Sequence, residues 1–384
     1  MSGIRLGIIG VCGTIATAHR RHLVEVEGLD AVAGCDPQAD RLAQLAKAEG
    51  FKPFESAEAM IDSGEVDAVL VACPHYQHPI YARYALERGV HVLVEKPVAV
   101  TAREAAETDA LYDAARKRSP GLIYAAMFNQ RTRSDWQLIK RLIDDGRLGE
   151  LMRTSWTITG CYRTQRYYDS GGWRATWAGE GGGVLINQCP HFLDLFQWFV
   201  GVPRRVNASV RLGGHHHIEV EDEVSARLEF DNGSLGTFSA ATTQSPGMNR
   251  IEIVGSRGTV IAKDDGRVTF LENLEPLDRF THESPQRMGG PWHHTHEIEC
   301  GGESPQHLGI LRNFVDAIRN GDPLIAPATE GIRSLELGNA MLMSGLTGRS
   351  IEIPTDREAY AKLLGELIRK ADRALAKEPP PAGA

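Results

Sequence analysis

The first 124 residues alternate short, uniformly apolar runs with longer stretches of helical periodicity. The apolar runs cover residues 4–10, 30–35, 68–73, 90–94 and 122–127. Between them, sequences such as ADRLAQLAKAEG and PIYARYALERG have the spacing of amphipathic helices. Apolar strands joined by helices are typical of a parallel sheet covered on both faces. The pattern predicts an α/β fold with an N-terminal, doubly wound parallel sheet.

The pattern changes near residue 151, after which polar and apolar residues alternate. Alternation recurs in RVNASVRL, VEDEVSARLEF, SLGTFSAATT, RIEIVG and RVTFLE. These runs predict strands with one buried face, and Asn232-Gly233 is a strong hairpin signal. Helical patterns occur in FLDLFQWFV, in HLGILRNFVDAIRNG and from residue 355 to about 377. We therefore expect a C-terminal α+β region with a large open, mostly antiparallel sheet.

The length of 384 residues is long for a single core and normal for two domains. We predict the α/β domain over residues 1–125 and the α+β domain over residues 126–355. A C-terminal helix and a disordered tail, ending in EPPPAGA, are expected over residues 356–384.

Composition narrows the class of protein. A net charge of −8 argues against nucleic acid as the main partner. The six cysteines are scattered without CxxC spacing, which favours reduced intracellular thiols over a disulfide framework. No apolar run approaches the ~20 residues of a membrane span, and the N-terminus lacks a signal-peptide layout. We expect a cytoplasmic protein.

The first apolar run ends in a sequence that suits a bound pyrophosphate. Residues 10–16 read Gly-Val-Cys-Gly-Thr-Ile-Ala, and Gly10, Gly13 and Thr14 open the following helix. Backbone N–H groups at such a helix start bind phosphate oxygens, and glycine lets the chain come close. The run departs from G-x-G-x-x-G, because Cys12 takes the second glycine position and Ile15 or Ala16 the third. An ordinary turn between strand and helix is the alternative.

Asp36 follows the second run, where an acidic residue hydrogen-bonds the ribose hydroxyls of a dinucleotide. Its carboxylate would repel a 2′-phosphate, which favours NAD over NADP. Arg41, one turn later, is compatible with NADP, and Asp36 also suits a plain helix start.

Two further stretches follow apolar runs, at strand ends where open α/β sheets bind ligands. The first contains Pro74, His75 and His78, and the second is Glu95-Lys96-Pro97. Lys96 follows a buried run and precedes a proline that disfavours a helix. A solvated loop lysine is the alternative for Lys96.

Taken in order, residues 10–16, Asp36, HVLVEKP (91–97), FNQR (128–131) and GGGVLINQCPHFLDLFQW (181–198) resemble the Gfo/Idh/MocA family. The resemblance runs from residue 4 to about 354. It implies an NAD(P)-dependent oxidoreductase of sugars or inositols, with an N-terminal Rossmann domain. It also implies a homodimer or homotetramer formed through the C-terminal sheet.

The resemblance identifies site residues. Lys96 matches the lysine of the family's EKP, and His191 matches the histidine that ends its glycine-rich segment. Asn187 stands where many members carry aspartate, which puts in doubt a proton relay through a carboxylate. The implied cofactor-binding set consists of Gly10, Cys12, Gly13, Thr14, Ile15, Asp36, Pro74, His75, His78, Glu95, Lys96, Asn129, Trp173 and Arg174.

The chemistry of alcohol oxidation suits these groups. A secondary alcohol needs a hydride acceptor and a base for its hydroxyl proton, and the imidazole of His191 titrates near neutrality. Lys96 would hydrogen-bond the same oxygen and stabilise developing alkoxide charge. If Asn187 lies near a helix start, His191 lies one turn on. As alternatives, Asn187 is only an N-cap, and His191 has a core or capping role.

The helix after His191 has a clear apolar face. Residues Phe192, Leu193, Leu195, Phe196 and Phe199 recur at helical spacing and are expected in the core. Asp194 is expected to be structural. The three glycines at 181–183 allow a close approach of ligand to backbone or form a tight turn.

Residues 161–177 combine aromatic and basic side chains, which suit the apolar face and hydroxyl edge of a sugar ring. We expect substrate contacts from Tyr162, Arg163 and Tyr168 together with Lys96, Asn187 and His191. An interface loop is the alternative. Histidines at 215–217, 293, 294 and 296 have no standard zinc spacing, so we expect no metal and read residues 282–305 as a loop.

The favoured hypothesis is an NAD-dependent dehydrogenase that reversibly oxidises a ring hydroxyl of a sugar or glycoside, with C3 preferred. Alternatives are an inositol dehydrogenase, a lyase or glycosidase that uses bound NAD transiently, and a non-catalytic NAD-binding regulator.

Overall fold

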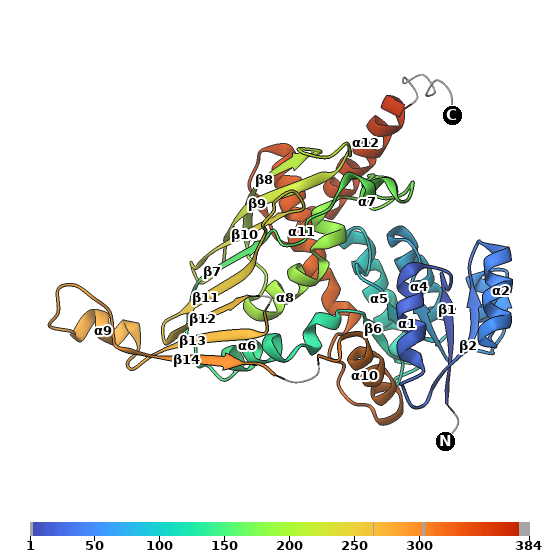
Figure 1. Ribbon diagram of the computed structural model, residues 1–384, viewed down its shortest axis with the longest axis horizontal. Coiled ribbons are helices and arrows are strands. Elements are labelled where there is room, and N and C mark those ends of the chain that lie inside the picture. The colour runs from blue at the N-terminus through green and yellow to red at the C-terminus, as the bar shows by residue number, and fades with distance from the viewer. Residues whose placement is uncertain (1–2, 264, 302–303, 376–384) are drawn as a thin grey trace. The chain divides into compact units, whose positions relative to one another are not determined.

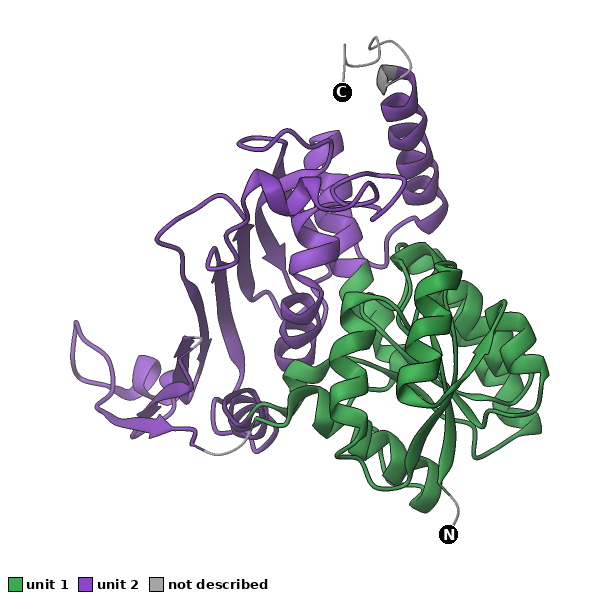
Figure 2. Ribbon diagram, turned by 45° about the vertical axis from the view of Figure 1, so that its right-hand side comes forward, with its two compact units in different colours: residues 1–133, 304–335 green, residues 134–303, 336–384 purple. Residues whose placement is uncertain are grey.

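The computed structural model describes residues 3–263, 265–301 and 304–375 and divides the chain into two compact units (Figures 1 and 2). The first unit comprises residues 1–133 and 304–335, and the second comprises residues 134–303 and 336–384. Helix α10 (Gln306–Asn320) therefore belongs to the first unit, although it follows most of the second unit in the sequence. The expected tail at residues 376–384 lies outside the described residues.

The first unit contains six parallel strands in the order β3-β2-β1-β4-β5-β6. The strands are β1 (Ile4–Ile9), β2 (Leu29–Cys35), β3 (Lys52–Phe54), β4 (Ala68–Val71), β5 (His91–Val94) and β6 (Tyr124–Ala126). The helices are α1 (Thr14–Leu23), α2 (Ala39–Glu49), α3 (Ala57–Asp62), α4 (His78–Glu87), α5 (Ala102–Arg118) and α10, with short turns η1 (His75–Gln77), η2 (Asn129–Thr132) and η4 (Ala328–Glu330). This is the strand order of a dinucleotide-binding fold, and it confirms the predicted doubly wound sheet.

Residues 304–335 join the first unit through buried contacts. The side chain of Arg131, which is buried, forms an ion pair of 2.5 Å with Glu330. The backbone N–H of Ala126, in β6, donates a 2.9 Å hydrogen bond to the carbonyl oxygen of Ala326. A buried guanidinium needs a partner, so these contacts hold the later segment against the sheet.

The second unit contains a sheet in the order β14-β13-β12-β11-β7-β10-β9-β8-β15. The strands are β7 (Leu151–Ile158), β8 (Arg205–Leu212), β9 (Glu221–Glu229), β10 (Leu235–Ala241), β11 (Asn249–Gly255), β12 (Gly258–Lys263), β13 (Arg267–Asn273), β14 (His293–Glu299) and β15 (Ile351–Glu352). The helices are α6 (Ser134–Asp144), α7 (Gln165–Asp169), η3 (Val184–Gln188), α8 (Pro190–Val200), α9 (Leu277–Glu283), α12 (Arg357–Leu375) and α11 (Gly331–Thr347), whose first five residues are assigned to the first unit. The pairings are antiparallel except between β7 and β10, so the predicted mostly antiparallel sheet is confirmed.

Aromatic residues form the core between the second sheet and the helices drawn beside it in Figure 1. The ring of Trp156, in β7, lies 5.8 Å from Trp136 in α6 and 6.2 Å from Phe199 in α8. Phe196 contacts Phe238 in β10 with ring centroids 6.0 Å apart. The predicted apolar face of α8 is confirmed for Leu193, Leu195, Phe196 and Phe199, whereas Phe192 is half-buried. This packing holds the first turn of α8, where His191 lies.

Three local predictions met different outcomes. The hairpin at Asn232-Gly233 is confirmed, because β9 and β10 pair across it and Gly233 has φ +82°. The prediction of a loop at residues 282–305 is wrong in part, because β14 pairs there with β13 at the sheet edge.

All six cysteines are free thiols. Within the described residues, none of the helices has the length and apolar character needed to cross a bilayer.

Candidate active site

The turn after β1 brings backbone close to backbone. Gly10 has φ +80°, and a Cβ there would lie 2.7 Å from the carbonyl oxygen of Ala72. The N–H of Gly13 donates a 2.9 Å hydrogen bond to the carbonyl oxygen of Gly10, and α1 begins at the next residue. Thr14 is exposed and Ile15 half-buried. The start of α1 therefore points its backbone N–H groups out of a tight glycine turn.

Asp36 ties the end of β2 to this turn. Its Oδ2 accepts a 3.0 Å hydrogen bond from the backbone N–H of Cys12, and its Oδ1 accepts one of 3.0 Å from Gln38. Burial, together with the charge of Asp36, raises the pKa of the Cys12 thiol. Cys12 is therefore a neutral, buried side chain, and only its backbone takes part in the turn.

The loops after β4 and β5 are joined by a histidine. The two ring nitrogens of His78 lie 2.7 Å from the carbonyl oxygens of Cys73 and Pro97. Burial lowers the pKa of His78, and its two hydrogen bonds oppose this effect. His75 is also buried, with its ring 5.9 Å from that of His78, and Pro74 precedes it. His78 therefore holds the loop that carries Lys96 against the loop after β4.

Glu95 is a buried carboxylate directly before Lys96. Its Oε1 lies 2.6 Å from Nε2 of His19, and its Oε2 accepts a 3.1 Å hydrogen bond from the backbone N–H of Lys96. Burial alone would raise the pKa of Glu95, but the hydrogen bond and charge of His19, with Lys96 and His307, outweigh burial and lower it to about 2. Lys96 itself is half-buried between buried neighbours, unlike a fully solvated loop lysine.

Two histidines of this group were missed in the sequence. His19 faces inward at helical spacing from Ala16 and Leu23, and a buried histidine on an apolar face needs a partner, which was the available signal. His307 lies with its ring 5.2 Å from that of His19, and burial, with the charge of His19, lowers the pKa of His307 to about 4. Asn129 Nδ2 is 3.1 Å from Nδ1 of His307.

The ligand atoms of His19, Glu95 and His307 lie within 4.8 Å of one another. We assign no metal to them. The imidazole of His19 and the carboxylate of Glu95 are 2.6 Å apart, whereas two ligands of a tetrahedral zinc lie about 3.3 Å apart. The geometry is that of a hydrogen-bonded pair. The histidines of β14 form no comparable group among the described residues, and His296 instead lies 3.1 Å from Glu272.

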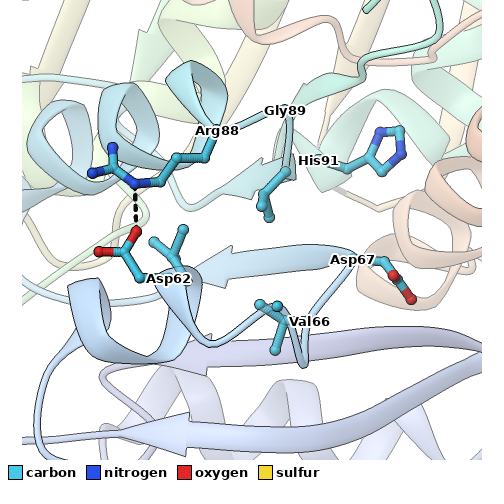
Figure 3. A pocket seen from close by; sticks show the side chains of 9 residues that line it. Asp62, Val66, Asp67, Arg88, Gly89 and His91 are labelled. Carbon is cyan, nitrogen blue, oxygen red and sulfur yellow. Dashed lines mark hydrogen bonds and ion pairs between the residues drawn. The ribbon is translucent and has the colours of Figure 1, made fainter.

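A pocket of about 460 Å³ lies elsewhere in the first unit (Figure 3). It is lined by Asp67, which precedes β4, by His91, which begins β5, and by the ion pair between Asp62 and Arg88. These are the amino ends of the strands. Open α/β sheets bind ligands at the carboxyl ends, so this pocket does not belong to the candidate site.

In the second unit the glycine run packs against a buried carboxylate. The backbone N–H of Gly183 donates to both oxygens of Glu221 at 2.9 Å, and that of Leu185 donates at 3.0 Å. A Cβ on Gly183 would lie 2.0 Å from the carbonyl oxygen of Glu221. Gly183 therefore allows a close approach of the backbone of Glu221, which is neither the ligand approach nor the tight turn considered from the sequence. Burial, with the charge of Glu180 adding, raises the pKa of Glu221 to about 7 although these N–H groups oppose it.

This shift predicts a pH-dependent stability. The folded protein holds the proton of Glu221 after the unfolded chain has lost it, so its contribution is present below about pH 4.5 and lost as the pH rises to about 7. The full shift corresponds to roughly 3 kcal/mol. We expect urea unfolding across this range to show the fall in the wild type and a smaller fall in Glu221→Gln. Equal falls in both proteins would contradict the assignment.

Asn187 and His191 lie on consecutive turns. Asn187 belongs to a π-helical turn, η3, and Cys189 precedes α8, so Asn187 is not the N-cap of that helix. Its Nδ2 donates a hydrogen bond to Oε1 of Glu180. His191 is half-buried in the first turn of α8 after Pro190. Asp194 is buried and accepts a 3.1 Å hydrogen bond from Gln197, which agrees with a structural role.

Residues 161–177 supply one stacked group and one buried tyrosine. The guanidinium of Arg174 lies 4.6 Å from the ring centroid of Trp173 and 4.9 Å from that of Tyr167. Tyr168 is buried, its hydroxyl 2.8 Å from Oγ1 of Thr242, and burial raises its pKa to about 12. Tyr162 is exposed. Tyr168 is therefore a packing residue in this structure, while Trp173 and Arg174 are half-buried.

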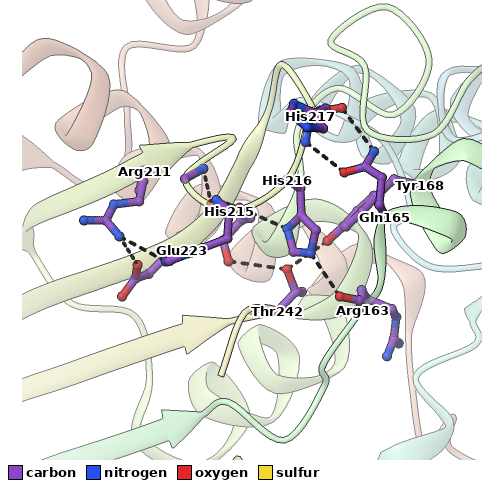
Figure 4. A network of polar contacts seen from close by, with 11 residues as sticks. Arg163, Gln165, Tyr168, Arg211, His215, His216, His217, Glu223 and Thr242 are labelled. Carbon is purple, nitrogen blue, oxygen red and sulfur yellow. Dashed lines mark hydrogen bonds and ion pairs between the residues drawn. The ribbon is translucent and has the colours of Figure 1, made fainter. Parts of the chain in front are cut away.

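The histidines at 215–217 lie against the segment of residues 161–177 (Figure 4). Nδ1 of His216 lies 3.0 Å from Asp222, and Nε2 lies 3.0 Å from the carbonyl oxygen of Arg163. His217 donates its backbone N–H to Gln165 at 2.8 Å. His216 therefore positions the backbone around Arg163, and both of its ring nitrogens already have partners within the protein.

Two family models match this chain. The oxidoreductase family with an NAD-binding Rossmann fold matches residues 4–123, and the GFO/IDH/MocA C-terminal domain matches residues 136–261. The chain belongs to the GFO/IDH/MocA family. The resemblance identified in the sequence is confirmed, and with it an oxidoreductase whose first unit is an NAD-binding Rossmann domain.

Relatives match over nearly the whole chain. D-Glucoside 3-dehydrogenase of Escherichia coli (strain K12) is 27% identical over 376 residues, which is 92% of this chain and 98% of the relative. Rhizopine catabolism protein MocA of Rhizobium meliloti is 27% identical over 351 residues, 88% of this chain and 94% of the relative. The WlbA dehydrogenase from Bordetella pertussis, solved in complex with NADH and UDP-GlcNAcA, has a TM-score of 0.80 at 27% identity and covers 92% of this chain and 99% of that one.

The carboxyl edge of the first sheet fits the dinucleotide of this family. The turn at Gly10 leaves no space for a side chain, and the start of α1 follows it. Oδ1 of Asn129 is buried, and no described residue hydrogen-bonds to it, so an acceptor is available to a bound group. Asp36, at the end of β2, is half-buried and suits the ribose hydroxyls.

Proposed function

We propose that this family member is an NAD-dependent dehydrogenase that reversibly oxidises a ring secondary hydroxyl of a sugar or glycoside, at C3, to a ketone. The observation that carries the proposal is the position of Lys96, which follows β5 at the sheet edge that also carries the Gly10 turn and Asp36. An ammonium group at the cofactor edge of the sheet is suited to an alcohol oxygen undergoing oxidation. The likeness to D-glucoside 3-dehydrogenase over 92% of the chain supports the substrate class.

The roles follow from the chemistry of each side chain. When bound, NAD supplies the hydride acceptor. His191, at the start of α8, takes the proton of the substrate hydroxyl as general base. Lys96 donates a hydrogen bond to the same oxygen and stabilises its developing negative charge. Glu95 stays ionised behind Lys96 and holds the backbone of that residue in place.

The proposal is tested by a screen of NAD reduction over monosaccharides, anhydrosugars, inositols and glycosides. Stoichiometric NADH with a sugar or glycoside is the expected result. Cleavage or elimination without net NADH would instead identify an enzyme that recycles NAD in place. Reduction only with inositols would correct the substrate class.

Asp36→Ala should weaken the binding of NAD by about 10–100-fold and that of NADP much less. A hydrogen bond to a charged group contributes about 1.5–3 kcal/mol, and only NAD offers both ribose hydroxyls to this carboxylate. Calorimetric titration of each dinucleotide measures the effect. Asp40→Ala, which removes an exposed carboxylate of α2, is the control. Equal weakening of both dinucleotides would remove Asp36 as the discriminating residue.

A further inference from the structure

Arg163 is a half-buried arginine in the segment that precedes α7. Arg20, Arg131 and Arg357 are also buried or half-buried, and each pairs with a glutamate, at 2.7, 2.5 and 2.8 Å. Within the described residues, no carboxylate oxygen lies within 4.0 Å of the Arg163 guanidinium. A cation that loses part of its water without gaining a counter-charge is unfavourable. The side chain of Arg163 therefore suits an anion that the protein itself does not supply.

The hydrogen bonds of the Arg163 side chain occupy only part of its guanidinium. Nη1 donates to the carbonyl oxygens of Cys161 at 3.3 Å and of Tyr162 at 3.0 Å. Nε is buried, and none of the described residues accepts a hydrogen bond from it. Nη2 has no acceptor in this part of the chain either, but unlike Nε it is accessible to solvent. A guanidinium is a planar fork of donors that fits a carboxylate or a phosphate, so Nη2 is left for such a group.

The backbone of Arg163 is held on both sides. Its N–H donates a 2.9 Å hydrogen bond to the carbonyl oxygen of Thr242, and its own carbonyl oxygen lies 3.0 Å from Nε2 of His216. Figure 4 shows the guanidinium turned away from His216. The buried carboxylate of this network, Asp222, accepts two backbone N–H groups of the β8–β9 connection at 3.0 Å and lies 3.0 Å from Nδ1 of His216. The guanidinium therefore projects from a fixed backbone, and Asp222 is used elsewhere.

The ring of Tyr167, in α7, connects this cation to the candidate catalytic helix. The guanidinium of Arg163 lies 5.0 Å from the ring centroid of Tyr167, and the hydroxyl of Tyr167 accepts a 3.4 Å hydrogen bond from Nε2 of Gln188. Gln188 ends η3, three residues before His191. All four residues belong to the second unit. Arg163 is therefore separated by one aromatic side chain from the turn that precedes the proposed base.

A second guanidinium at the same ring already has a counter-charge. Arg174 lies 4.9 Å from the ring centroid of Tyr167 and donates a 3.1 Å hydrogen bond to its hydroxyl. Nη1 of Arg174 also lies 3.7 Å from Oε1 of Glu180. Two cations and one carboxylate leave one positive charge over. Because Glu180 pairs with Arg174, the uncompensated charge is that of Arg163.

We propose that Arg163 is a specificity-determining residue that binds an anionic group of the sugar substrate, a carboxylate or a phosphate. This inference rests on the proposed function and deepens it, because it names the substrate class as a sugar acid or a sugar phosphate. Hydrogen bonds from a guanidinium to an oxyanion are roughly twice as strong as those between neutral groups. A neutral sugar offers only hydroxyls at this position, so Arg163 favours the charged substrate.

Matched sugars that differ in the charged group test the proposal on the unmodified protein. The pairs are methyl glucoside with methyl glucuronide, glucose with glucose 6-phosphate, and methyl α-glucoside with α-glucose 1-phosphate. We expect kcat/KM to be about 10–100-fold higher for the anionic member of at least one pair. The pair that shows this preference identifies the group as a carboxylate or a phosphate. No preference for the anionic member in any of the three pairs would overturn the proposal.

Arg163→Gln keeps a planar polar end and removes the charge. We expect kcat/KM of the anionic sugar to fall about 10–100-fold more than that of its neutral partner. Arg163→Lys keeps a positive charge without the planar fork and should lose less of the preference than Arg163→Gln. Arg166→Gln removes an exposed arginine of the same helix and should leave the preference unchanged. Equal falls for both members of the pair in Arg163→Gln would contradict the assigned role.

Calorimetric titration separates this inference from the proposed function. With NADH in place of NAD, the sugars are not oxidised during the titration. The anionic sugar should bind the wild type more tightly than its neutral partner and lose that advantage in Arg163→Gln. If binding behaves in this way but no sugar yields NADH in the assay with NAD, the proposed function fails while the anion site stands. If sugars are oxidised and the anionic members have no advantage in binding or turnover, the proposed function stands and the anion site is excluded.

Discussion

His191→Ala should lower the turnover of the preferred sugar or glycoside by about 10²–10⁴-fold, the usual contribution of a positioned general base. The imidazole lies in the first turn of α8, whose apolar face is packed against Trp156 and Phe238, so the base stands on a rigid helix. Removing it leaves the hydroxyl proton without an acceptor. Steady-state turnover, followed by NADH absorbance, measures the loss.

Two controls separate this effect from misfolding. His282→Ala removes an exposed histidine of α9 and should leave turnover unchanged. The affinity of His191→Ala for NAD should equal that of the wild type, because the Gly10 turn and Asp36 belong to the other unit. Turnover within twofold of the wild type would remove His191 as the base.

Lys96→Met should lower kcat by about 10²–10³-fold, the range seen when one donor to a developing oxyanion is lost. Methionine keeps much of the unbranched stem and removes the ammonium group. The loop itself should persist, because His78 still bridges Cys73 and Pro97 and Glu95 still pairs with His19. The loss should therefore appear in kcat more than in KM.

Lys47→Met, on the exposed face of α2, is the matched control and should leave kcat and KM unchanged. An increase in KM with unchanged kcat would show that Lys96 stabilises the bound substrate and the transition state equally well. That result would exclude the proposed stabilisation of the developing charge.

Hydrophobic pattern predicted most of the first sheet. Strands β1, β4, β5 and β6 fall within the predicted apolar runs, and β2 begins one residue before its run, because a parallel strand covered on both faces is uniformly apolar. Strand β3 (Lys52–Phe54) was missed, since its three residues are largely exposed at the sheet edge and include a proline. Strand β14 was missed for a related reason: six of its seven residues are exposed, and pairing with β13 alone makes it a strand.

The sequence predicted those candidate-site residues that directly follow a strand. Gly10, Asp36 and Lys96 each follow a recognisable strand, and parallel strands bring their carboxyl ends to one edge. His19 and His307 were not found this way. His19 meets Glu95 across 76 positions, and Asn129 meets His307 across 178. Neither pair has a local pattern that would connect its members.

The same limit applies in the second unit. The glycines at 181–183 were expected to admit a ligand or to form a tight turn, and the sequence did not reveal that Gly183 instead approaches Glu221, 38 positions away. Tyr168 was expected to contact substrate, whereas the structure buries it against Thr242 and His216. An aromatic residue among polar ones suits a binding surface and a small core equally well, so its environment decides its role.

The sequence by itself determined the family, most strands and helices of the first unit and the strand ends at which its chemistry is expected, because the periodicity of apolar residues and the residues that follow a strand are local properties of the chain. Only the tertiary structure decided which buried polar groups meet: Glu95 with His19, Glu221 with the glycine run, and Glu180 with Asn187. A buried carboxylate has to find donors wherever the fold brings them, and those donors come from backbone and side chains whose positions in the sequence carry no common pattern.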